Sequence, residues 1–67
     1  MKYGIVKTWD PIKGFGFILT DEGEDLFLHS SDLDITLSYK QIREGLRVRF
    51  DIKSDMKGDR AVHVRQA

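Results

Sequence analysis

Short runs of alternating apolar and polar residues, separated by turn-forming residues, extend along the whole chain of 67 residues. In the run 46–53 (LRVRFDIK), every second residue is apolar: Leu46, Val48, Phe50 and Ile52. Side chains of a strand point alternately to its two faces, so this run predicts a half-buried strand. Similar runs lie at 2–9, 13–19, 25–29 and 60–65, the last of them directing Val62 and Val64 inward. The pattern predicts a single all-β domain over residues 1–67, a small five-stranded antiparallel barrel.

Two of these runs, KGFGFIL (13–19) and DLFLH (25–29), carry aromatic residues on only one side. The connecting residues 20–24 (TDEGE) are typical of a hairpin turn. Aliphatic residues of all five runs already fill the opposite face, so the rings would lie outside the core. We expect four rings on the outer surface of this hairpin: Phe15, Phe17, Phe27 and His29. A cluster of exposed rings indicates a binding surface.

KGFGFI (13–18) and DLFLHSSDL (25–33) resemble the two ribonucleoprotein motifs of the bacterial cold-shock proteins. The first matches without a change, and the second is close. The similarity extends over essentially all 67 residues and includes Gly4, Lys7, Gly45 and the pair Lys57-Gly58. It implies an OB-type barrel that binds single-stranded RNA and DNA with little sequence preference. It also implies an RNA chaperone that affects transcription or translation.

The chain departs from the family pattern at two positions. Thr8-Trp9 stands where the family usually has Trp-Phe, and Ser30 stands where it generally has an aromatic residue. Because a strand's faces swap at every residue, the shifted indole either turns away from the ligand or is accommodated by a bulge. We expect Trp9 on the binding face or at its edge, with packing at the barrel rim as the alternative.

Residues after the second motif are less regular. Residues 29–33 have the composition of one short helical turn, with Leu33 anchoring it to the core. By the resemblance, Tyr39 in the loop 34–44 contacts nucleic acid, although it could instead pack the loop onto the barrel. Lys57, also by the resemblance, lies next to the ligand, and the alternative is a solvated turn tip.

Basic and acidic residues number eleven each, so the formal net charge is zero, but their distribution is uneven. Residues 1–39 contain three lysines and seven acidic residues, whereas residues 40–67 contain eight basic and four acidic ones. A protein that binds by stacking needs little net charge, and its affinity should depend only weakly on salt. Lys7 and Lys13 would add positive charge beside the rings. Asp25 would either accept a hydrogen bond from a base edge or pair with one of these lysines.

The residue content argues against other classes of function. The chain contains His29, His63 and many carboxylates but no Cys nucleophile, no metal-ligand spacing and no Gly-rich loop leading into a helix, so we expect neither an enzyme nor a cofactor or metal. No apolar run approaches the ~20 residues of a membrane span, and we expect a cytoplasmic protein without membrane or small-molecule partners. A monomer is expected, with a strand-swapped dimer left open. Docking of a protein partner on the rings is the alternative function.

Overall fold

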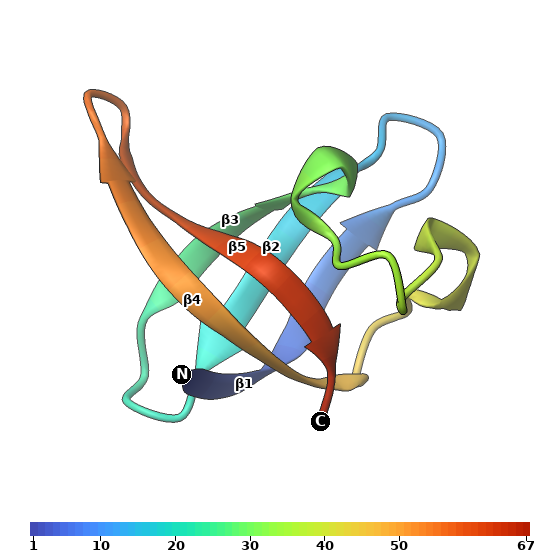
Figure 1. Cartoon of the computed structure of the whole chain (residues 1–67), viewed down its shortest axis with the longest axis horizontal. Helices are drawn as coiled ribbons and strands as arrows, with labels where there is room; N and C mark the ends of the chain where they lie inside the picture. The colour runs from blue at the N-terminus through green and yellow to red at the C-terminus, as the bar shows by residue number, and fades with distance from the viewer.

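Five strands close into a barrel in the structure, a computed structural model that describes the backbone of residues 1–67 and all side chains except those of Tyr39 and Asp55 (Figure 1). The strands are β1 (Lys2–Asp10), β2 (Phe15–Thr20), β3 (Asp25–His29), β4 (Arg47–Asp55) and β5 (Gly58–Gln66). Two single 3-10 turns, η1 (Ser30–Asp32) and η2 (Tyr39–Gln41), lie between β3 and β4. None of the described helical segments has the length and apolar character needed to cross a membrane. The strand order β1-β2-β3-β5-β4 confirms the predicted OB-type barrel.

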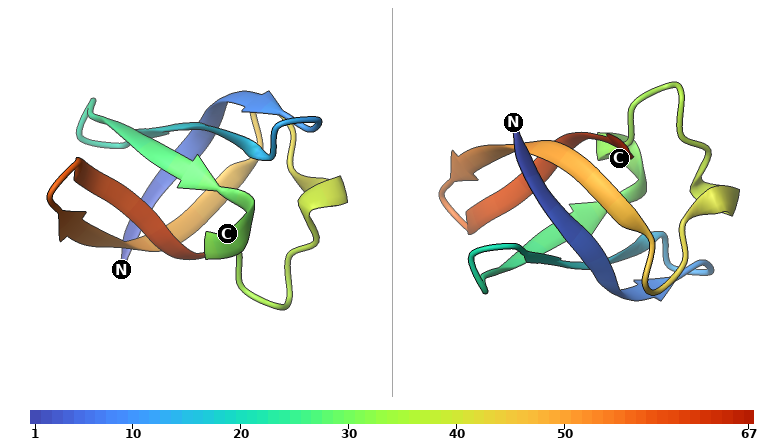
Figure 2. Two further views of the ribbon diagram at one scale, coloured as in Figure 1. Left: turned by 90° about the horizontal axis from the view of Figure 1, so that it is seen from above. Right: turned by 90° about the horizontal axis from the view of Figure 1, so that it is seen from below.

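Antiparallel pairing joins β1 to β2 and β4, β2 to β3, and β4 to β5. By contrast, β3 and β5 run parallel, with Phe27 beside Arg60, and this pairing closes the otherwise antiparallel barrel. The chain leaves β3 through η1 and η2 and completes β4 before β5 returns alongside β3. Figure 2 shows the connection containing η2 projecting at the opposite end of the barrel from the β4–β5 turn.

The core is the aliphatic face that the alternation predicted. Its fully buried members include Val6, Ile18, Leu28, Val48 and Phe50. Two residues of the irregular connection, Leu37 and Ile42, are also buried there, and Leu33 packs against it as expected. Ile52 is 37% exposed, which corrects its expected inward position; it lies beyond Phe50, where the pairing of β4 with β1 ends. The core is therefore complete without the four rings.

A bulge in β1 determines to which side of the sheet the last residues of this strand point. The pairing with β2 runs from Val6–Ile18 directly to Thr8–Phe17, so Lys7 is an extra residue. Thr8 therefore faces outward with Phe17, and Trp9 faces inward opposite Gly16. The strands cross closely here, and a Cβ at Gly16 would overlap the carbonyl oxygen of Thr8. Only glycine permits this approach.

A second bulge lies in β5 at His63. The pairing passes from Arg49–Arg65 to Asp51–Val62, and His63 has φ +53°, in the left-handed region. This bulge corrects the expected inward position of Val62: Ala61 is fully buried instead, and Val62 is only partly buried. His63 consequently projects from the outer face of the strand, where it is exposed.

A bidentate ion pair joins the β2–β3 turn to β4. Arg47 Nη1 and Nη2 donate to Asp21 Oδ1 and Oδ2 at 2.7 and 2.8 Å, and the same guanidinium lies 5.6 Å from the centre of the Tyr3 ring. The hydrogen bonds from Arg47 lower the pKa of Asp21 below its ordinary 3.8. The pair therefore stabilises the fold when Asp21 is ionised, and this contribution is lost as pH falls through the lowered pKa.

His63→Val should lower the free energy of unfolding by about 1–2 kcal/mol, although valine is the better strand former, because a β-branched residue is strained at positive φ. Urea denaturation would measure the loss. Lys53→Val, at an exposed β4 position without positive φ, is the control and should not destabilise. Equal stability of the two variants would contradict the strained bulge.

Asp21→Asn should destabilise the protein at pH 7, and its difference from wild type should shrink as pH falls through the lowered pKa of Asp21, because the wild-type carboxyl is then itself protonated. Arg47→Gln should give the same pH dependence, since it removes the other half of the pair. Urea midpoints measured from pH 7 to pH 2 test this expectation. A loss from Asp21→Asn that is as large at the acid end as at pH 7 would show that the ion pair is not its cause.

Candidate nucleic-acid interface

Four rings lie together on the outer face of β2 and β3, as the alternation predicted. Phe17 is paired with Phe27, and Phe15 with His29. Phe27 is the centre of the cluster: its centroid lies 5.9 Å from those of Phe15 and Phe17 and 6.3 Å from that of His29. We call these four residues the ring cluster.

The rings differ in orientation and exposure. Phe17 meets Phe27 nearly edge-on at 76° and is 42% exposed, whereas Phe15 and His29 are tilted from Phe27 by only 32° and 34°. Neighbouring rings support one another by offset and edge-to-face contacts, so each is held in place while it stays at least partly exposed. Flat surfaces thus remain available to a stacking ligand.

His29 is oriented by the η1 turn that follows it. Its Nδ1 accepts a hydrogen bond from the backbone N–H of Ser31 at 3.1 Å and lies 2.8 Å from Ser31 Oγ. In the neutral imidazole, this acceptor role of Nδ1 leaves the proton on Nε2. His29 therefore combines a stacking surface with a hydrogen-bond donor.

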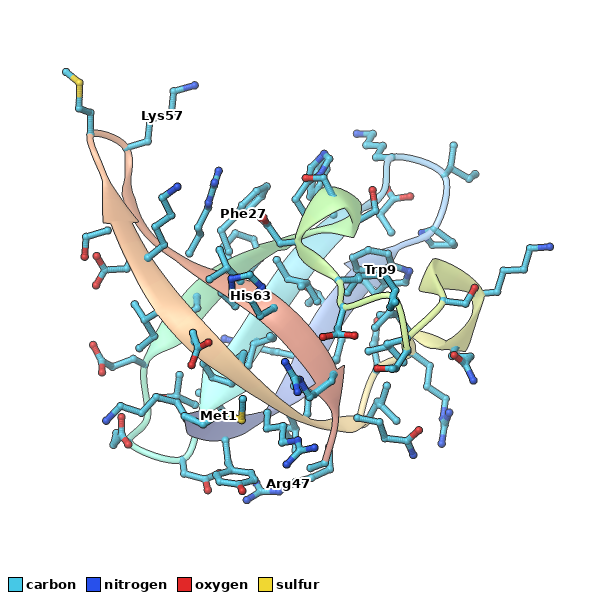
Figure 3. The ribbon with its side chains drawn as sticks, viewed as in Figure 1. Met1, Trp9, Phe27, Arg47, Lys57 and His63 are labelled. Carbon is cyan, nitrogen blue, oxygen red and sulfur yellow. The ribbon has the colours of Figure 1, made fainter. Side chains whose placement is uncertain are left out.

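A cleft of about 550 Å³ separates the ring cluster from the β4–β5 turn. On one side it is lined by Phe17, Asp25 and Phe27, and on the other by residues 57–60. Figure 3 shows Lys57 at the tip of the turn, on the same side of the barrel as Phe27. The volume lies in the range of pockets that hold small organic ligands.

Sequence reasoning placed Lys57 here but missed Asp59 and Arg60. Arg60 lies beside Phe27 only because β5 runs parallel to β3, a pairing that no local pattern announces. Lys13, the other expected cation, borders a separate hollow with Gly14 and Ser30. The side chain of Tyr39 lies outside the described residues, so its expected contact is not addressed by the structure.

Lys7 Nζ and Asp25 Oδ2 form an ion pair at 3.1 Å, with both side chains about half exposed. Of the two lysines considered as partners for Asp25, the structure thus selects Lys7. Such an exposed pair contributes little to stability. It does keep a cation and a hydrogen-bond acceptor together at the edge of the ring cluster.

Two hollows mark the positions where the chain lacks an aromatic residue. One, of about 190 Å³, is lined by Lys7, Thr8, Phe17 and Asp25. The other, of about 290 Å³, is lined by Ser30 and residues 11–14. Each hollow adjoins residues expected at the ligand, so a larger side chain at either position would enlarge the stacking surface.

Trp9 does not share the face of the ring cluster, contrary to expectation. The bulge at Lys7 directs it inward, and it packs against the core at the barrel rim, partly buried. Its Nε1 is buried and has no hydrogen-bond partner among the described residues. The sequence allowed for a bulge; because the bulge precedes Trp9, it turns the indole inward.

Comparison with known proteins places this geometry in a family. Residues 2–67 match the 'Cold-shock' DNA-binding domain family. The major cold shock protein of Streptococcus pyogenes is 41% identical over 64 residues, covering 96% of this chain and 94% of that protein. A cold shock-like protein of Thermotoga maritima is 44% identical over 62 residues, 92% of each chain, and cold shock protein CspC of Bacillus subtilis is 37% identical over the full length of both. The chain belongs to the cold-shock domain family.

Cold-shock domains bind single-stranded nucleic acids and are not enzymes. This membership confirms the function and the fold expected from the two motifs, and it does not favour protein docking as the main role. Among the side chains described here, no three potential metal ligands cluster. The ring cluster and its cleft are the candidate site on this cold-shock domain.

Phe17→Ala and Phe27→Ala should each weaken single-strand binding by the cold-shock domain by ~1–3 kcal/mol, with the fold retained, because both rings lie outside the core. Calorimetric titration and urea denaturation would measure the two effects separately. Val48→Ala is the control: it removes a fully buried side chain and should cost stability, with any binding loss following unfolding. Unfolding by either phenylalanine variant, without a separate binding loss, would show that the ring is structural.

Proposed function

We propose that this protein binds single-stranded RNA and DNA with little sequence preference by stacking bases on the ring cluster. The observation that carries the proposal is the set of four adjacent rings kept outside a complete core. Every nucleobase has a π-face, so each stack contributes ~1–3 kcal/mol whatever the base. Bases of a duplex are already stacked and do not reach these rings.

Polar groups around the ring cluster take complementary roles in this proposal. Lys7, Lys13 and Lys57 provide positive charge at its edges, and Asp25 accepts a hydrogen bond from an exocyclic amine of a base. His29 both stacks and donates through Nε2. Trp9, at the rim, is a reporter of folding rather than of ligand, and Tyr39 remains a proposed loop contact.

By holding bases apart from their complements, the protein acts as an RNA chaperone and thereby affects transcription or translation. We place it in the cytoplasm as a monomer that needs no cofactor.

Calorimetric titration with an unstructured pyrimidine oligonucleotide, compared with a duplex, tests the binding. Melting of a quenched RNA hairpin tests the chaperone activity. Equal affinity for the duplex, or no binding of the single strand, would refute the proposal.

Thr8→Trp and Ser30→Phe should each tighten binding to a pyrimidine oligonucleotide by up to ~1–3 kcal/mol, because each adds a ring at a hollow beside the proposed path. The dependence of affinity on salt should stay the same, since no charge changes. In Thr8→Trp the new indole should also respond to ligand in fluorescence. Gains below a few tenths of a kcal/mol for both folded variants would mean that the ligand does not pass over these positions.

A further inference from the structure

The outer face of β4 and β5 places like charges directly opposite one another. Lys53 is paired with Arg60, and Arg49 with Arg65. Asp51 lies between them on β4 but forms no ion pair with any described residue. Opposed like charges destabilise a sheet. Since proteins tend to break local rules at functional sites, this face is a candidate for one.

The two pairs differ in their surroundings. Arg65 is matched by Asp34, with Nη2 and Oδ2 3.1 Å apart. At the other pair, Arg60 Nε lies 3.8 Å from Asp32 Oδ2, whereas Lys53 forms no ion pair with any described residue. An incoming anion is therefore better accommodated beside Lys53.

A hollow of about 220 Å³ opens at this pair. Three basic residues line it, Lys53, Arg60 and His63, together with Ser31, Asp32, Leu33 and Val62. His63 borders it because the β5 bulge projects this residue from the strand, and Figure 3 shows His63 over β5. Two fixed cations, an imidazole and a hydroxyl outnumber the single carboxylate, a balance that favours a phosphate group.

The hollow is continuous with the ring cluster through Arg60, which lines both this hollow and the cleft beside Phe27. Neighbouring strands are about 4.8 Å apart, so Lys53, two strands from Phe27, lies roughly 10 Å beyond it. A stacked single strand has one phosphate per about 3.4 Å. About three further nucleotides would reach the hollow.

We propose that Lys53, Arg60 and His63 bind a backbone phosphate of the same single strand after it leaves the ring cluster past Arg60. A bound phosphodiester would offset the repulsion between Lys53 and Arg60. This site rests on the proposed function and extends the ligand path from the β2–β3 face onto the outer face of β4 and β5.

The test measures how the affinity for a ten-residue oligodeoxythymidine depends on salt, in wild type and in Lys53→Gln. Loss of one phosphate contact should reduce the slope of log K against log salt by about 0.7 and weaken binding about fivefold near 0.1 M salt. Lys2→Gln is the matched control, because Lys2 pairs with Glu22 and lines none of these hollows. The melting temperature of Lys53→Gln should not fall, since the substitution removes a like-charge contact.

A second set of ligands locates the contacted phosphate along the oligonucleotide. Neutral methylphosphonate linkages at one end of the oligonucleotide should weaken wild-type binding as much as Lys53→Gln does. With this modified ligand, Lys53→Gln should weaken binding no further. Equal slopes for Lys53→Gln and Lys2→Gln, with Phe17→Ala still impaired, would overturn the phosphate site and leave the proposed function standing. Absence of single-strand binding by the wild type would overturn both.

Discussion

The close crossing of β1 and β2 at Thr8 and Gly16 is the constraint on which the binding surface depends. The Thr8 carbonyl occupies the space of a Gly16 side chain, so β2 can bend tightly around the barrel. The extra residue in β1 at the same level decides which side chains face outward. Together they place Thr8, which carries no ring, beside Phe17 and turn the indole of Trp9 to the rim.

The exposure of the ring cluster follows from the small volume of the barrel interior, which other side chains fill. Aliphatic side chains from all five strands, with Phe50 of β4 and with Leu37 and Ile42 of the long connection, fill the barrel. The ring cluster is left outside, and contacts among its own members keep it ordered. The same face thus owes its rigidity to the sheet and its exposure to a core that is already full.

Although the net charge is zero, the charged residues are unevenly placed in the fold. Acidic residues of the first half meet basic residues of the second in the pairs Asp21–Arg47 and Asp34–Arg65. These pairs hold turns and connections against the last two strands. The outer face of those strands has two pairs of opposed cations, Arg49–Arg65 and Lys53–Arg60. A neutral cold-shock domain can therefore present a locally cationic path next to a stacking surface.

The sequence by itself determined the number of strands, nearly all of their core residues and the outward placement of the ring cluster. Each of these follows from local alternation, because a residue's face in a regular strand depends only on its neighbours along the chain. The bulges at Lys7 and His63 interrupt the alternation, so Trp9 and Val62 do not lie on the faces that it predicts. The parallel pairing that sets Arg60 beside Phe27 was likewise decided by the tertiary structure. Closing a small barrel requires strong coiling and a fixed offset between strands. The positions of the bulges and the pairing of β3 with β5 therefore depend on all five strands together rather than on any one segment.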